Sequence, residues 1–231
     1  MDFLRVLFTA VLYLNIPMAI TSFVFAFILL RRAKGNGIYF NFGMATLFLA
    51  LWQVALPLLF IDFSLPFNIF LVNVTWLFGI WIMHYFLIFT YNFPISTLYS
   101  HKQLGFLYLL TLFVSFTFFI PDLYTKGAYP NFPFLKLVVN PIGLTIYTVF
   151  FVSLAFFSFK NLIVNFLKSD GIFRIQLKKI IIGTGVAVIA NLFLSITIYY
   201  FIDFDTAPLG TVFVFAVLLY IYSILFSKKY V

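Results

Sequence analysis

Long uncharged segments alternate with short charged or Pro/Gly-rich breaks along the whole chain. Each uncharged segment is long enough to cross, or nearly cross, the ~30 Å hydrocarbon core of a bilayer, because a helix rises about 1.5 Å per residue. The pattern predicts seven membrane helices, at about residues 6–30, 38–60, 68–91, 104–120, 142–167, 177–202 and 208–226. We therefore expect an all-α fold: a polytopic seven-transmembrane-helix bundle that forms a single domain over residues 1–231.

Composition also indicates a membrane protein. Hydrophobic residues make up 65% of the chain and charged residues 9%, whereas a soluble domain carries roughly 25% charged residues. The net charge of +8 comes from basic residues that flank the apolar segments, so we expect contact with membrane lipid and no nucleic-acid partner. The chain has no cysteine, which excludes disulfides and thiolate metal sites.

The N-terminal segment is expected to be a retained helix and not a signal peptide. Its first charge is Asp2, its apolar run continues to Leu30, and no small-residue cleavage site follows.

The placement of Lys and Arg predicts the orientation of the bundle, because cytoplasmic loops are enriched in both. If the segment after the first helix is cytoplasmic, only three basic residues fall outside: Arg5, Lys126 and Lys136. The acidic residues distribute oppositely, since only Asp170 then lies inside. The sequence therefore predicts a multi-pass protein of the cytoplasmic (inner) membrane with its N-terminus outside and its C-terminus cytoplasmic.

The predicted helices contain no charged residue near the bilayer centre, where such a residue would be a functional candidate. Lys160 lies in the last turns of its helix and can reach the cytoplasmic interface. His84 is the one histidine within a predicted helix, and we expect it to be a hydrogen-bonded interior side chain. No nucleophile elbow or P-loop is present, so we expect no catalytic residue, no metal site, no cofactor and no enzymatic activity.

Uncharged polar and small residues recur at helical spacing in two of the predicted helices. One helix carries Asn73, Trp76, Ile80, His84, Leu87 and Tyr91 on one face; another carries Lys179, Gly183, Ala187, Asn191 and Ser195 every four residues. Such stripes are typical of helix packing, which is the simpler explanation for any one residue. Alternatively, polar side chains in the outer half line an outward-opening pocket, in which case the candidate ligand-binding residues are Gln53, Asn73, Trp76, Asn191, Ser195, Tyr199 and Asp205, with Asn15 at the same depth.

The segment from Pro121 to Pro141 is the one sizeable outer loop that the pattern predicts. Its aromatic residues form either a lid or, as we favour, an interfacial aromatic belt; they are Tyr124, Tyr129, Phe132 and Phe134.

The last two predicted helices carry the residues of a family pattern: Arg174-Ile175-Gln176, Gly183, Asn191 and Asp205-Thr206-Ala207-Pro208-Leu209-Gly210. Together with Arg31-Arg32 and Leu51-Trp52-Gln53 near the start, this pattern resembles the N-terminal seven-transmembrane sensor domain of bacterial histidine kinases. The likeness covers nearly the whole chain in helix number and length, and its specific part is confined to the last two helices.

The resemblance implies a receptor-like sensor, a signal-input domain for an unknown small-molecule ligand or a membrane signal. In that family the last helix leads into a cytoplasmic output domain, usually a dimerising histidine kinase, so a homodimer is implied. No phosphoacceptor histidine or ATP-binding motif follows residue 226. We therefore expect the chain either to belong to a longer protein or to act with a separate partner protein. The alternatives are a small transporter or channel and a purely structural membrane subunit.

Overall fold

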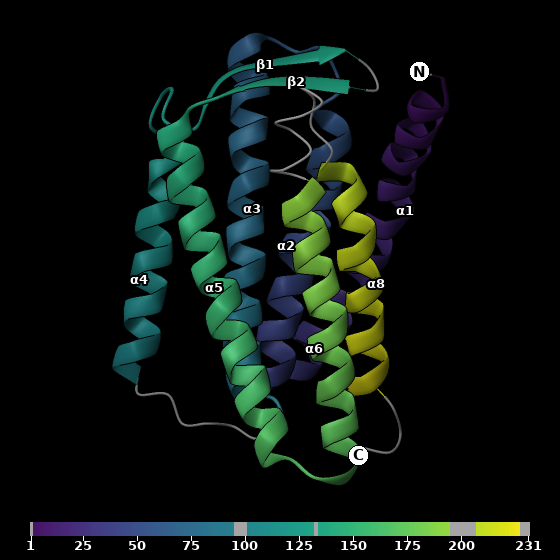
Figure 1. Cartoon of the computed structure of the whole chain (residues 1–231), viewed down its shortest axis with the longest axis vertical. Helices are drawn as coiled ribbons and strands as arrows, with labels where there is room; N and C mark the ends of the chain where they lie inside the picture. Colours follow the sequence, from purple (N-terminus) through teal and green to yellow (C-terminus); the bar gives the residue numbers. More distant parts are fainter. Residues whose placement is uncertain (1, 95–100, 132–133, 195–206, 227–231) are drawn as a thin grey trace.

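The computed structural model describes residues 2–94, 101–131, 134–194 and 207–226, and within these ranges the chain is helical apart from one β-hairpin (Figure 1). The helices are α1 (Asp2–Ala33), α2 (Gly37–Leu58), α3 (Leu65–Asn92), α4 (His101–Thr117), α5 (Pro141–Lys168), α6 (Gly171–Leu192) and α8 (Ala207–Leu225). The strands are β1 (Thr125–Asn131) and β2 (Phe134–Val139). The all-α class expected from the sequence agrees with this architecture.

Four of the described helices are long and apolar enough to cross a membrane: α1, α2, α3 and α5. The apolar parts of α4 and α8 are shorter, and the first turns of α6 carry Arg174, Lys178 and Lys179. The chain therefore has the character of a membrane protein. Seven crossings and their orientation are not established by these four spans.

Several helices begin earlier than hydrophobicity alone suggests, α4 and α6 among them. α6 starts at Gly171, six residues before the predicted position, and α4 starts at His101 instead of 104. These early turns contain Lys102, Gln103, Arg174 and Gln176, and Lys, Arg and Gln favour helices as well as most apolar residues do. Hydropathy thus locates the apolar part of a helix and not its first turn.

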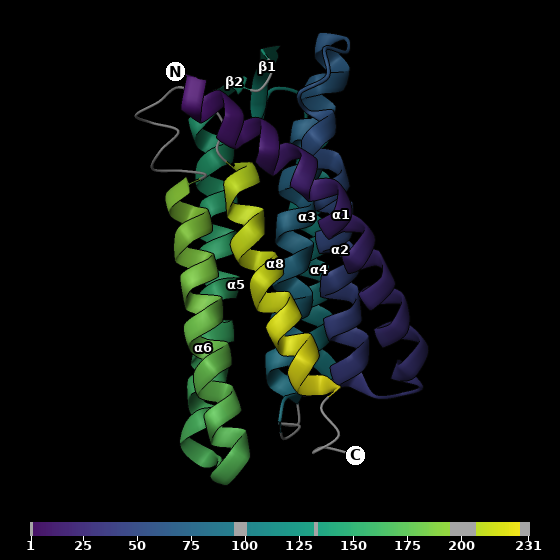
Figure 2. The same ribbon diagram turned by 90° about the vertical axis from the view of Figure 1, so that its right-hand side faces the viewer.

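Six helices form a closed ring, in which α1 packs on α2, α2 on α3, α3 on α5, α5 on α6, α6 on α8, and α8 back on α1 (Figures 1 and 2). α4 stands outside this ring and touches α3. Two buried hydrogen bonds join neighbouring helices of the ring near the end where the β-hairpin lies. The hydroxyl of Ser22 donates to Gln53 Oε1 at 2.8 Å, and the hydroxyl of Thr211 donates to Asn15 Oδ1 at 3.0 Å.

The segment predicted as an outer loop or aromatic belt contains the antiparallel β1–β2 hairpin, which covers one end of the bundle (Figure 1). Along β2, Leu135 and Leu137 are buried while Lys136 and Val138 are exposed. This alternation is the period-two pattern of a strand with one covered face, and it was available in the sequence.

Tyr124 does not belong to an interfacial belt, because it is fully buried. Its ring stacks on Phe118 at 4.0 Å between centroids, and its hydroxyl lies 2.8 Å from Thr117 Oγ1. Burial raises the pKa of the Tyr124 phenol, and the hydrogen bond to Thr117 opposes that shift. Tyr129 is exposed, whereas Phe132 and the side chain of Phe134 lie outside the described residues.

Asn140, at the start of α5, is hydrogen-bonded to the segment that precedes the hairpin. Asn140 caps the helix by accepting from Ile142 N at 3.1 Å, and its own amide donates to the Asp122 carbonyl at 2.8 Å. One turn further on, Gly143 packs so closely that a Cβ there would overlap the Leu123 carbonyl oxygen and lie 2.8 Å from Tyr124 Cα. Only glycine allows this approach of α5 to the hairpin.

Replacing Gly143 with Ala should therefore destabilise the protein by roughly 1–3 kcal/mol or more, because backbone has to move. Thermal unfolding of the purified protein in detergent measures the effect. Gly105→Ala is the matched control, since no atom lies within 4 Å of a Cβ at that helical position; it should be neutral or stabilising by up to about 1 kcal/mol. Equal unfolding temperatures for the two variants would contradict the close contact at Gly143.

Candidate functional site

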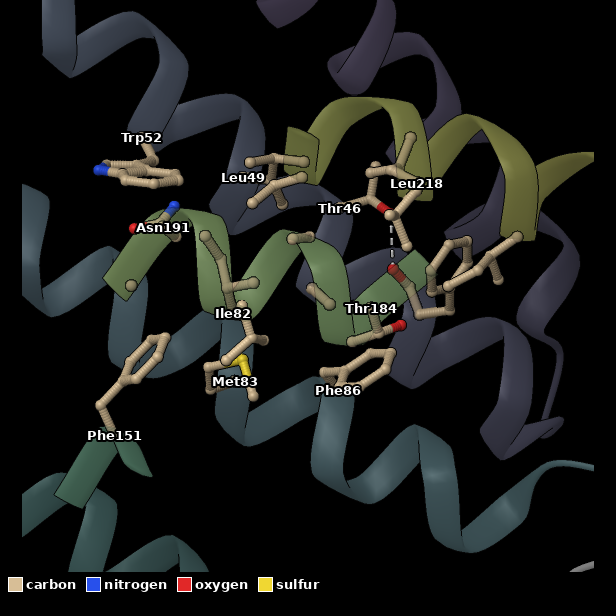
Figure 3. Close-up of a pocket in the computed structure, with 18 of the residues that line it drawn as sticks. Thr46, Leu49, Trp52, Ile82, Met83, Phe86, Phe151, Thr184, Asn191 and Leu218 are labelled. Carbon is tan, nitrogen blue, oxygen red and sulfur yellow. Dashed lines mark hydrogen bonds between the residues drawn. The ribbon is translucent and has the colours of Figure 1, made fainter. Parts of the chain in front are cut away.

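The ring of helices encloses a cavity of about 100 Å³ that is lined by α2, α3, α5, α6 and α8 (Figure 3). Its wall is almost entirely apolar and aromatic. Ten of the lining residues are labelled in Figure 3: Thr46, Leu49, Trp52, Ile82, Met83, Phe86, Phe151, Thr184, Asn191 and Leu218.

The cavity forms because the helices pack in a ring and because some residues on the inner faces of that ring are small. α6 and α8 pack against α5 and α1 at the two sides of the ring, whereas α2 and α3 stand opposite them across the centre. Ala45 and Ala187 are among the lining residues, and their short side chains leave the central layer unfilled. A void of this size forfeits packing contacts that larger side chains would have made.

Thr184 is the polar side chain that distinguishes this cavity from a packing defect. It is 6% exposed, and its Oγ1 has no hydrogen-bond partner within the described part of the chain. Thr46, also in the wall, instead donates to the Phe42 carbonyl of its own helix at 2.7 Å. An unpaired buried hydroxyl costs about 1–3 kcal/mol, so a polar atom of a bound molecule would relieve that cost.

Trp52 and Asn191 lie together at one end of the cavity, and Thr46 and Thr184 lie toward the other (Figure 3). Asn191 also touches α8, because a Cβ on Gly210 would lie only 2.8 Å from Asn191 Nδ2. The side chain of Asn191 therefore lies where the cavity, α6 and the first turn of α8 meet. Of the predicted ligand-binding residues that the structure describes, Asn191 is the one placed in the cavity wall.

The other described candidates lie in helix contacts away from the cavity wall. Gln53 is buried against α1, where its Oε1 accepts from Ser22 and its Nε2 has no partner among the described residues. Asn73 donates from Nδ2 to the Phe118 carbonyl at 3.2 Å. The ring of Trp76 packs 5.1 Å from that of Tyr147, which does line the cavity. Ser195, Tyr199 and Asp205 lie outside the described residues.

Sequence inspection missed Thr184 and Trp52. Thr184, Ala187, Val188 and Asn191 follow the i, i+3, i+4, i+7 spacing of one helix face. The stripe predicted from the sequence ran through Lys179, Gly183 and Ala187. That stripe lies on the same helix but is rotated slightly from the face that lines the cavity. A search for hydroxyls on the face next to Asn191 would have found Thr184.

His84 is buried and hydrogen-bonded, as the sequence predicted. Its Nδ1 lies 2.8 Å from Thr111 Oγ1, and the Thr111 hydroxyl is committed as a donor to the Leu107 carbonyl at 2.9 Å. His84 Nδ1–H is therefore the donor, which assigns the tautomer from the network. Among the described residues, no group of three or more His, Cys, Asp or Glu is placed to hold a metal ion.

The sequence matches no protein-family model, and no curated protein is similar enough to be a relative. Fold and site together define a class: an α-helical bundle of membrane-protein character with an apolar cavity at the centre of its helix ring.

The Thr184 hydroxyl, which has no hydrogen-bond partner among the described residues, leads to a prediction about the free energy of unfolding. Thr184→Val keeps the shape of the side chain but removes Oγ1, so it should stabilise the ligand-free protein by about 1 kcal/mol. Thr46→Val is the matched control and should change stability by less than about 0.5 kcal/mol, because it removes a hydroxyl bonded within its own helix. Thermal unfolding in detergent compares the two. A Thr184→Val variant less stable than Thr46→Val would show that Thr184 has a partner.

Proposed function

We propose that this chain is a receptor-like transmembrane sensor whose central cavity takes up a small apolar molecule. The observation that supports it is the cavity itself, which touches five helices at once and contains the buried Thr184 hydroxyl, for which no described residue is a hydrogen-bond partner. A ligand that fits this space would carry one hydrogen-bonding group toward Thr184 and apolar groups toward the aromatic walls. Such molecules partition into membranes and can reach the cavity from lipid.

The signal would leave through α8. This helix contacts Asn191 at Gly210 in its first turn, passes the cavity with Val214, Val217, Leu218 and Ile221, and continues to the opposite end of the bundle. A ligand can shift the packing of α8 only by the difference between its affinities for two packings. The far end of α8 is the place where we propose that a cytoplasmic output module acts.

The resemblance to the sensor domains of histidine kinases supports the same assignment. It implies an output domain or partner protein on the cytoplasmic side and a homodimeric assembly. On this proposal the chain crosses the cytoplasmic membrane seven times, and α4, α6 and α8 supply the three crossings beyond the four long apolar spans. The N-terminus and the β-hairpin would face outward, and the basic ends of α1 and α5 would face the cytoplasm.

The sensor proposal is tested by filling the cavity in a fusion of residues 1–231 to a histidine-kinase output module. Ala187→Leu places a larger side chain in the cavity and should lock one packing of α8, changing output about fivefold or more, since allosteric couplings are typically 1–3 kcal/mol. Val186→Leu is the matched control. Val186 is the neighbour of Ala187 on the same helix, but its side chain is 53% exposed, so this substitution should leave output unchanged. Wild-type output from well-expressed Ala187→Leu would refute a signalling role for the cavity.

The proposed orientation is tested by cysteine accessibility, because the natural chain has no cysteine. Arg31→Cys and Tyr129→Cys each add a single thiol at an exposed position, one at the end of α1 and one on β1. In intact cells a membrane-impermeant maleimide should label the cysteine at 129 and not the one at 31, and both should react after lysis. The reverse pattern would place the hairpin in the cytoplasm and overturn the orientation.

A further inference from the structure

The turn between α1 and α2 lies at the end of the bundle opposite the β-hairpin (Figure 2). A hollow of about 670 Å³ there, which we call the basic pocket, is lined by Phe27, Ile28, Arg31, Arg32, Lys34 and Tyr39. It shares no lining residue with the central cavity. It is therefore a separate feature of the molecule.

The backbone of the turn concentrates positive charge in this pocket. Lys34 and Gly35 adopt positive φ values of 29° and 88°, which reverse the chain tightly, and Asn36 caps α2 by accepting from Ile38 N at 2.9 Å. The carboxylates nearest in sequence stand far away, because Asp2 begins α1 at its other end and Asp62 follows the far end of α2. Three exposed cations thus gather with no acidic neighbour along α1 or α2.

Two side chains of the basic pocket also hold the end of α8. The guanidinium of Arg32 lies 4.5 Å from the centroid of the Phe226 ring, and the hydroxyl of Tyr39 donates to the Leu225 carbonyl at 3.4 Å. Just inside this contact, Phe25 of α1 stacks on Tyr222 of α8 at 3.8 Å. The end of α1, the first turn of α2 and the end of α8 are therefore joined beside the pocket.

We propose that the basic pocket binds the phosphate-bearing headgroup of an anionic membrane phospholipid, and that the bound headgroup holds the end of α8 against α1 and α2. Arg32 can serve both contacts, because stacking uses the face of a guanidinium and phosphate binding uses its in-plane N–H groups. Each Lys or Arg near an anionic headgroup strengthens binding.

A membrane lipid fits this pocket better than a free phosphate does. Phe27, 65% exposed, and Ile28 extend the wall of the pocket along α1 toward the middle of an apolar span. An acyl chain attached to the headgroup would lie along these side chains. A soluble phosphate would make no use of them.

The binding test uses the whole chain in nanodiscs and native mass spectrometry. Phosphatidylglycerol should remain bound to the wild type, and Arg31→Gln with Lys34→Gln should weaken its binding about thirtyfold, since each cation near an anionic headgroup strengthens binding about fivefold. The matched control is Lys160→Gln with Lys168→Gln, which removes the same charge from exposed positions of α5 and should leave binding near wild type. Equal losses in both double variants would overturn the site, because they would show diffuse attraction to charge.

The coupling test places one spin label on Ser223→Cys, an exposed position of α8 in a chain without cysteine. Replacing phosphatidylcholine with phosphatidylglycerol should reduce the mobility of the label in the wild type and not in the Arg31→Gln/Lys34→Gln variant. An unchanged mobility despite lipid binding would overturn the link to α8. Inorganic phosphate added to phosphatidylcholine nanodiscs should have no effect; if it reproduced the change, the lipid assignment would be wrong. None of these outcomes depends on whether the chain is a sensor.

Discussion

Closure of the helix ring by α1 and α8 is the constraint on which the rest of the structure depends. In a membrane, helices gain little from leaving apolar surroundings, so close packing and specific polar contacts have to hold them together. The α1–α8 seam has such contacts at both ends. Thr211 donates to Asn15 at one end, and the guanidinium of Arg32 packs on the Phe226 ring at the other, where Tyr39 of α2 also donates to the Leu225 carbonyl. The seam joins segments nearly two hundred residues apart in the sequence.

Contacts between neighbouring helices hold the ring together at its sides, so the ring does not depend on side chains that fill its centre. α2 and α3 face α6 and α8 across a layer where the short side chains of Ala45 and Ala187 leave a cavity. α8 contributes to this cavity along its middle and to the aromatic contacts beside the basic pocket at its end. One helix therefore touches both proposed binding sites. On our proposals, an apolar molecule in the centre and a lipid headgroup at the end would bias the same element.

Buried polar residues that join neighbouring parts of the bundle differ from Thr184. Gln53, Asn73 and His84 each make one hydrogen bond to a neighbouring helix or to the segment that ends it, and each keeps one further polar atom unpaired among the described residues. These contacts fix how neighbouring helices are rotated. Thr184 differs, because its hydroxyl makes no such contact and lies in the wall of a cavity. That difference separates helix packing from a candidate ligand site.

The sequence by itself determined the helical class, the membrane character and the burial of His84, because hydropathy and helical spacing are local properties. It could not tell which apolar face is buried: Phe89 is fully buried and Phe113 is 68% exposed, although both lie in apolar helices. The hairpin around Tyr124, the meeting of Asn191 with Gly210 and Trp52, and the pairing of Arg32 with Phe226 were decided only by the tertiary structure. Each depends on the rotation and crossing of helices distant in sequence, which no local pattern encodes.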